Sequence, residues 1–174
     1  MKGKKMSEHI QAEMYYMVKK YLDGKLNCDV WRYTVDDDVP FFHGFTLHNN
    51  EVSDMKYGFF IAEHAVVCYI QCPIPVPEAM RSSVAEYIIR VNEKELEGCF
   101  EMVYDEGFVR YKKLLSYNDL HNEKVACASL VKAKLAAMLA WQRYGENLFV
   151  LMLNETKGKT VAQLAAESES KQYD

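Results

Sequence analysis

The chain has 174 residues, of which 49% are hydrophobic and 26% are charged, and its formal net charge is −4. This length and composition are enough for one domain with a full hydrophobic core. The mild acidity argues against a nucleic-acid-binding protein, because affinity for phosphates comes from clustered lysine and arginine, and the basic residues here are scattered.

The cysteines and the amino-terminal residues indicate the compartment. No Cys-x-x-Cys pair occurs and the number of cysteines is odd, so the sequence predicts neither a disulfide framework nor a zinc-binding knuckle. The basic amino-terminal residues are not followed by the apolar run of a secretory signal, and no uncharged apolar run reaches the length of about 18 residues that a membrane span needs. We therefore expect a cytoplasmic protein with reduced thiols and no membrane partner. The cysteines are Cys28, Cys68, Cys72, Cys99 and Cys127.

The first half of the chain predicts one helix followed by strands. Ser7 can cap a helix that runs to about Leu22, where Asp23 and Gly24 stop it. Alternating apolar residues then predict strands at 31–35, 41–47, 55–62 and 65–72. The last of these reads AVVCYIQC and is nearly all apolar. We expect it at the centre of an antiparallel sheet, covered on both faces.

The second half predicts a helix, a hairpin and a long helix. Pro77 can open a helix over about 78–95, which Gly98 ends. Strands near 100–104 and 109–112 are joined by a turn at 105–107 that places Gly107 in the left-handed conformation. A long helix starts at Asn118 or Asn122, and Gly145 kinks or divides it.

The order of elements, α-β(β)ββ-α-ββ-α, predicts an α+β domain in which helices pack on one antiparallel sheet. We assign residues 1–155 to this domain. Residues 156–174 contribute a short helix near 161–166, set off by Gly158, and a tail that we expect to be frayed.

The segment VPEAMRSSVAEYIIRVNEKELEGCFEMVYDEGFVRYKKLLSY carries a recognisable pattern. A proline-led helix has an arginine near its start and an asparagine near its end, and a glycine precedes a strand, an acidic-glycine turn and a strand with an arginine. The positions are Pro77, Arg81, Asn92, Gly98, Gly107 and Arg110.

This pattern, over about residues 41–153, resembles the YbjN-like bacterial proteins, a family labelled as sensory-transduction regulators. The family is similar in fold to type III secretion chaperones, which are small acidic homodimers that hold extended client segments. The resemblance implies a chaperone-like fold, a homodimer and a possible protein or peptide client. It implies no enzymatic activity.

The predicted helix over 78–95 has two apolar arcs at about 100° per residue. The first arc can pack on the sheet, and the second must be covered either by the long carboxy-terminal helix or by a second subunit. Asn92 lies between the arcs, where we expect it to bond backbone groups at the helix end or across to the hairpin. The first arc is Met80, Val84, Tyr87, Ile88 and Val91, and the second is Ala85, Ile89 and Leu96.

Catalytic signatures such as a phosphate-binding loop or a nucleophile elbow are missing from the sequence. His64 and Cys68 read better as a turn histidine and a core thiol than as a dyad. Asp36–Asp38, with His43 and His48, are the residues of the alternative function, a small-molecule-binding protein or an enzyme. We expect no catalytic, metal or cofactor residues, and a non-catalytic protein-interaction or regulatory function.

Overall fold

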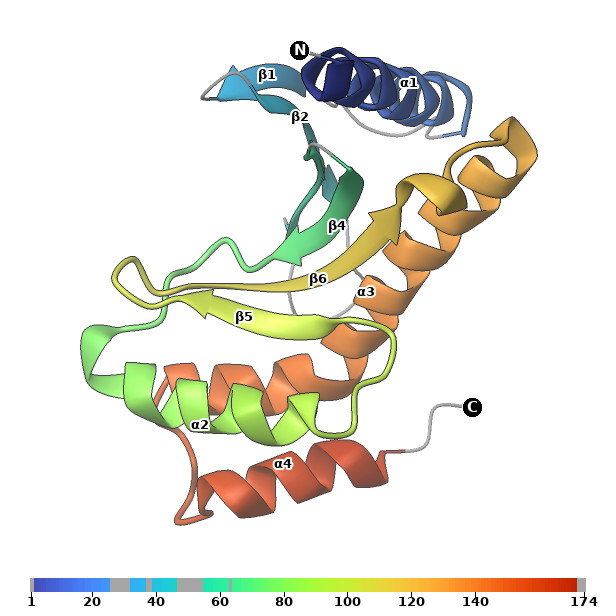
Figure 1. Cartoon of the computed structure of the whole chain (residues 1–174). Helices are drawn as coiled ribbons and strands as arrows, with labels where there is room; N and C mark the ends of the chain where they lie inside the picture. The colour runs from blue at the N-terminus through green and yellow to red at the C-terminus, as the bar shows by residue number, and fades with distance from the viewer. Residues whose placement is uncertain (1, 26–31, 37–38, 47–54, 63, 172–174) are drawn as a thin grey trace.

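The computed structural model in Figure 1 describes the backbone of residues 2–25, 32–36, 39–46, 55–62 and 64–171, and the side chains of 9–22, 55–62 and 64–171. In this part of the chain the α-helices are α1 (Lys2–Lys25), α2 (Arg81–Asn92), α3 (Glu123–Met152) and α4 (Val161–Ser170). The strands are β1 (Arg32–Asp36), β2 (Val39–Thr46), β3 (Met55–Ile61), β4 (Ala65–Gln71), β5 (Cys99–Val103) and β6 (Phe108–Ser116). Short 3₁₀ turns at Glu78–Met80 and Tyr117–Asp119 lead into α2 and α3.

The strands form one antiparallel sheet in the order β1-β2-β3-β4-β6-β5. Each strand follows its neighbour through a hairpin, except that α2 connects β4 to β5 and the β5–β6 hairpin then returns to pair β6 with β4. The predicted α+β fold is therefore confirmed.

The helices pack on one face of this sheet. Alternate residues of β3, β4 and β6 point toward α1 and α3 and are buried, among them Phe59, Cys68 and Tyr111. Figure 1 shows α3 running along the sheet and then beneath it to lie beside α2 and α4. We call the side of the sheet away from α1 and α3 the open face, because no described helix covers it.

β4 was expected to be central and covered on both faces. Its central position is confirmed, but the double cover is wrong, since only Val66, Cys68 and Ile70 face the helices. Val67 and Tyr69 lie on the open face, where side chains of the neighbouring strands shield them. An apolar run therefore does not distinguish cover by a helix from cover by strand neighbours.

The boundaries of two helices, α1 and α2, differ from the expectation. α1 begins at Lys2 and ends at Lys25, so Ser7 lies inside it and Asp23 and Gly24 do not stop it. A glycine or aspartate disfavours a helix by only about 1 kcal/mol or less, which packing can override. α2 ends at Asn92 rather than at residue 95, and a 3₁₀ turn that follows Pro77 precedes it.

α3 is a single helix that Gly145 does not divide. The side chain of Asn122 caps it by accepting a hydrogen bond from the Lys124 amide at 3.0 Å. A Cβ atom at Gly145 would lie 3.2 Å from the Trp141 ring, so the glycine makes room for that ring. The helix axis bends toward its carboxy-terminal end in Figure 1.

By length and composition alone, α3 could also cross a membrane. Its buried side chains, from Ala126 to Met152, instead belong to the core that the sheet, α1, α2 and α4 share. We therefore interpret α3 as a core helix.

A buried polar network attaches α4 to the rest of the fold. The Tyr87 hydroxyl donates to the Tyr144 carbonyl at 2.9 Å and lies 2.8 Å from the Ser168 Oγ atom. Asn147 donates to the Leu164 carbonyl and to Ser168, both at 2.9 Å. Residues 168–170, expected to be frayed, are helical, and Ser168 is fully buried. The expectation of a frayed tail is therefore wrong for these residues. It was based on apolar periodicity, whereas the contact that holds this end of α4 is made by the polar side chain of Ser168.

Asn92 holds the free edge of β5, as the sequence predicted for a residue that bonds across to the hairpin. Its Nδ2 atom donates to the Phe100 carbonyl at 2.9 Å, and its Oδ1 atom accepts from the Phe100 amide at 2.8 Å. These two backbone groups face away from β6. The side chain therefore takes the place of a neighbouring strand and blocks part of an exposed edge.

The glycines of the motif are structural as well. Gly107 adopts a φ of +80° in the β5–β6 turn, and its carbonyl accepts a hydrogen bond from the Val76 amide at 2.9 Å. A Cβ atom there would lie 2.6 Å from the Val76 carbonyl oxygen. At Gly98 a Cβ atom would lie 2.4 Å from the Lys112 carbonyl oxygen.

We predict that Asn92→Leu lowers the free energy of unfolding by about 1–3 kcal/mol, because both backbone groups of Phe100 lose their partner. Urea denaturation followed by circular dichroism measures the change. Glu93→Leu, at the exposed neighbouring position, is the control and should have a small effect. Equal midpoints for wild type and the Asn92 variant would refute this role.

Gly107→Ala should destabilise the protein more than Gly158→Ala. Both glycines have a φ of +80°, but nothing lies within 4 Å of a Cβ atom at Gly158. Each alanine should lose about 1–2 kcal/mol to backbone strain, and only the Gly107 variant adds the clash with Val76. Thermal unfolding of both variants gives the difference. Similar melting temperatures would show that the close approach to Val76 is unimportant.

Candidate functional site

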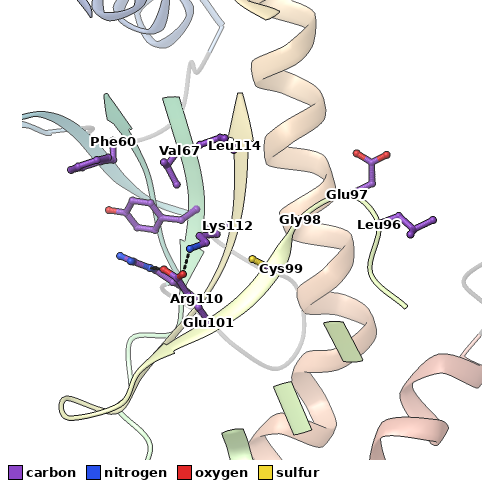
Figure 2. Close-up of a pocket in the computed structure, with 11 residues that line it drawn as sticks. Phe60, Val67, Leu96, Glu97, Gly98, Cys99, Glu101, Arg110, Lys112 and Leu114 are labelled. Atoms are coloured by element: carbon purple, nitrogen blue, oxygen red, sulfur yellow. Dashed lines mark hydrogen bonds and ion pairs between the residues drawn. The ribbon is translucent and has the colours of Figure 1, made fainter. Parts of the chain in front are cut away.

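The open face of the sheet holds a groove of about 620 Å³. Figure 2 shows side chains of β3, β4, β5 and β6 that line it, together with the loop that joins α2 to β5. We call this site the open-face groove. Its lining residues are Phe60, Val67, Tyr69, Leu96, Glu97, Gly98, Cys99, Glu101, Arg110, Lys112 and Leu114.

One part of the groove is apolar and open to solvent. Leu114 is 65% exposed and Phe60 is 38% exposed, with Val67 between their strands on β4. Figure 2 shows these three side chains on the side of the sheet away from α3. Leu96, at the rim, is 93% exposed. Neighbouring exposed apolar side chains of this kind are typical of a contact surface.

The other part of the groove is a charged cluster around Glu101. One carboxylate oxygen of Glu101 pairs with Arg110 and the other with Lys112. The Arg110 guanidinium also lies 5.8 Å from the centre of the Tyr69 ring, in cation–π range. Burial by itself would raise the pKa of Glu101, but the hydrogen bonds from Lys112 and Arg110 outweigh it and hold that pKa below its usual value. Glu101 is therefore ionised at neutral pH.

The groove offers no activated nucleophile among its described side chains. Its thiol, Cys99, has a pKa that burial raises above the ordinary value, so it is protonated at neutral pH. Burial likewise raises the pKa of the Tyr69 hydroxyl. The arrangement can bind apolar and charged groups.

The pair of His64 and Cys68 is not a dyad. His64 is exposed at the turn between β3 and β4, whereas Cys68 is fully buried on the helix-covered face, where burial raises its pKa to about 12. Burial also raises the pKa of Cys72, to about 11. The interpretation of Cys68 as a core thiol is confirmed, and Cys28 lies outside the described residues.

The two arcs of the α2 region have different surroundings. Val84, Tyr87, Ile88 and Val91 of the first arc are buried against the rest of the fold, and Met80 is partly buried against the core. In the second arc Ala85 is partly exposed, Ile89 is 65% exposed and Leu96 lies in the loop beyond α2. Cover of Ile89 and Leu96 by α3 was one of the two alternatives, and it is wrong, because α3 and α4 pack on the first arc instead.

Of the residues of the alternative function, the structure describes the backbone of Asp36 and His43, and these two lie apart. Asp36 pairs with Val39 at one end of the β1–β2 ladder, and His43 pairs with Arg32 at the other. At about 3.3 Å per residue, the two positions are about 13 Å apart. Asp37, Asp38 and His48, and the side chains of Asp36 and His43, lie outside the described residues. The described residues hold no group of three metal-ligating side chains.

The motif residues divide between fold and groove. Four of them shape α2 and the β5–β6 hairpin, namely Pro77, Asn92, Gly98 and Gly107. Arg81 is the first residue of α2, and its Nε atom lies 3.5 Å from the Val76 carbonyl. Arg110 belongs to the charged cluster. The sequence reasoning missed Glu101, Lys112 and Leu114 as site residues, although the alternation of Arg110, Lys112 and Leu114 along β6 was a signal that they share one face.

Comparison with protein-family models, curated proteins and solved structures gave no match to the chain. The resemblance to the YbjN-like family therefore stays a prediction that rests on the motif alone.

Proposed function

We propose that this protein is a non-catalytic, chaperone-like or regulatory protein that holds an extended segment of another protein in the open-face groove. The observation that carries the proposal is the apolar part of that groove, which the chain's own described helices leave uncovered. Burying the exposed parts of Leu114 and Phe60 under a partner would stabilise a complex by about 25 cal/mol for each Å² removed from water.

The capped edge of β5 supports a segment that lies across the face rather than one that extends the sheet at that edge. A peptide that adds a strand needs free backbone groups at the edge, and those of Phe100 are bonded to Asn92. The open face instead offers side-chain contacts from several strands. An extended segment can place alternate side chains on such a surface.

The rival function is a small-molecule-binding protein or an enzyme. Its residues are the polar positions near His43, His48 and Asp36–Asp38. A metabolite that stabilises the protein and whose effect depends on those positions would favour this rival, so both possibilities belong in one experiment.

The experiment compares Leu114→Glu with Leu153→Glu in the native cell. Both leucines are 65% exposed, but only Leu114 lies in the groove. We predict that quantitative mass spectrometry of affinity-purified protein recovers one or a few partners with wild type and with the Leu153 variant. The Leu114 variant should lose them by about tenfold or more, because a charge then faces the apolar contact.

Equal recovery with both variants would contradict the groove as the contact surface. A thermal-shift screen of metabolites and metal ions, run on the same three proteins, provides the other arm. A single metabolite that stabilises all three, with no partner recovered, would favour the rival function.

We also propose that the protein is a homodimer through the outer surface of α2. Ile89 projects from this surface, and Glu86 and Arg90 form an ion pair of 2.8 Å next to it. A twofold axis between these two charged residues would bring each carboxylate toward the partner's guanidinium, so the surface is complementary to itself. The residues for this contact are Ala85 and Ile89. Leu96 is assigned to the groove.

Ile89→Glu should give a folded monomer, because a twofold interface would place two added carboxylates close together. Light scattering measures the mass of wild type and variant, and circular dichroism checks the fold. Leu153→Glu, at a position outside α2 that is as exposed as Ile89, 65% in both cases, should leave the mass unchanged. A monomeric wild type would end this proposal without affecting the groove.

A further inference from the structure

The charges in the open-face groove differ from those of the whole chain. The chain has a net charge of −4, yet the groove contains two cations, Arg110 and Lys112, around one carboxylate, Glu101. The other lining carboxylate, Glu97, is already paired with Lys113, which does not line the groove. With Lys113 counted, three cations face the two carboxylates of this region, which leaves one positive charge in excess.

Both cations keep the capacity for a second acceptor. An arginine has five N–H donors and a lysine has three, so a single carboxylate does not exhaust them. The side chains of Arg110 and Lys112 are 38% and 40% exposed, whereas that of Glu101 is 24% exposed. A ligand that approaches from solvent thus meets the cations more readily than the carboxylate between them.

The apolar part of the groove adjoins this cluster along the same strands. Leu114 follows Lys112 by two residues on β6, so both side chains lie on the open face. Val67 pairs with Leu114, and Tyr69 pairs with Lys112 on the neighbouring strand β4. Along β6, Lys112 lies two residues from Leu114, about 7 Å, and Arg110 lies two residues further on, so an extended ligand would meet the apolar contact first and then the two cations.

We propose that the open-face groove selects an extended protein segment in which an aspartate or glutamate stands two residues from a large apolar side chain. The acidic side chain bonds to Arg110 and Lys112, and the apolar side chain covers Val67 and Leu114. This inference rests on the proposed function, because it names the class of segment that the groove holds.

Glu101 then acts as the resident carboxylate of the site. In the free protein it neutralises part of the charge of Arg110 and Lys112, which lie two residues apart on the same face of β6 and would otherwise repel each other. The resident carboxylate competes with an incoming one for the same donors. A carboxylic acid that makes no apolar contact is therefore a poor ligand. A segment that supplies both a carboxylate for the cations and an apolar side chain for the groove is favoured.

The test uses three fluorescein-labelled peptides that repeat leucine-serine-X-serine, so that X stands two residues from each leucine and on the same face of an extended chain, with X as aspartate, asparagine or lysine. Fluorescence anisotropy should show that wild type binds the aspartate peptide about tenfold more tightly than the asparagine peptide, as expected for one charge-assisted contact. The lysine peptide should bind most weakly. Raising the salt concentration should reduce the preference for aspartate, since the cations are partly exposed to solvent.

Two variants locate the preference. Arg110→Met combined with Lys112→Met should bind the aspartate and asparagine peptides equally, because the apolar contacts remain and the cations are gone. Glu101→Gln should increase the affinity for the aspartate peptide, because the competing carboxylate is neutral. Circular dichroism of each variant shows that the fold is intact, and the Glu101 variant tests the proposal even if the double variant does not fold.

Equal affinity of wild type for the aspartate and asparagine peptides would overturn the proposal, and so would weaker binding of the aspartate peptide to the Glu101 variant. Failure of all three peptides to bind would also overturn it, while the comparison of Leu114 with Leu153 would still decide the proposed function. A further arm compares thermal stabilisation of the protein by succinate alone with stabilisation by the aspartate peptide. Equal stabilisation by succinate and by the aspartate peptide would show that the groove takes small carboxylic acids instead.

Discussion

The described helices cover only one face of the sheet, and this is the constraint on which the rest of the structure depends. A sheet buries its apolar side chains by packing on another layer, and this chain places α1 and α3 on one face, with α2 and α4 beyond β5. The strands nevertheless carry apolar residues toward both faces, as the alternation along β4 shows. Part of the apolar surface on the second face, at Leu114 and Phe60, is therefore exposed.

The neighbouring parts of the fold limit what such a partner can do. Asn92 closes the groups of Phe100 at the edge of β5, and the close contact of Gly98 with the Lys112 carbonyl brings the α2–β5 loop against β6. That loop carries Leu96 to the rim of the groove. The motif that joins α2 to the hairpin therefore blocks the edge of β5 at Phe100 and also shapes one wall of the open-face groove.

The sequence predicted the elements whose signals are local. Asn92 and Gly107 could be assigned from turn chemistry, and the buried arc of α2 from its periodicity. Gly98 was expected to end the helix, but α2 ends at Asn92 and Gly98 lies instead at a close approach to the Lys112 carbonyl. It could not predict which face of β4 is covered, because that depends on where α1 and α3 pack. The cluster of Glu101 with Arg110 and Lys112 needed the register of β5 against β6. The contact of Ser168 with Tyr87 joins residues 81 positions apart, and a single sequence holds no signal for it.

The central claim is that the open face is a binding surface for another protein. Site-specific photo-crosslinking in the native cell tests it most directly, with the photoreactive residue placed at position 114 or at position 153. We expect position 114 to crosslink to a defined segment of one or a few proteins, and position 153, which is equally exposed, to give no such product. Crosslinks to the same proteins from both positions, or from position 153 alone, would contradict it.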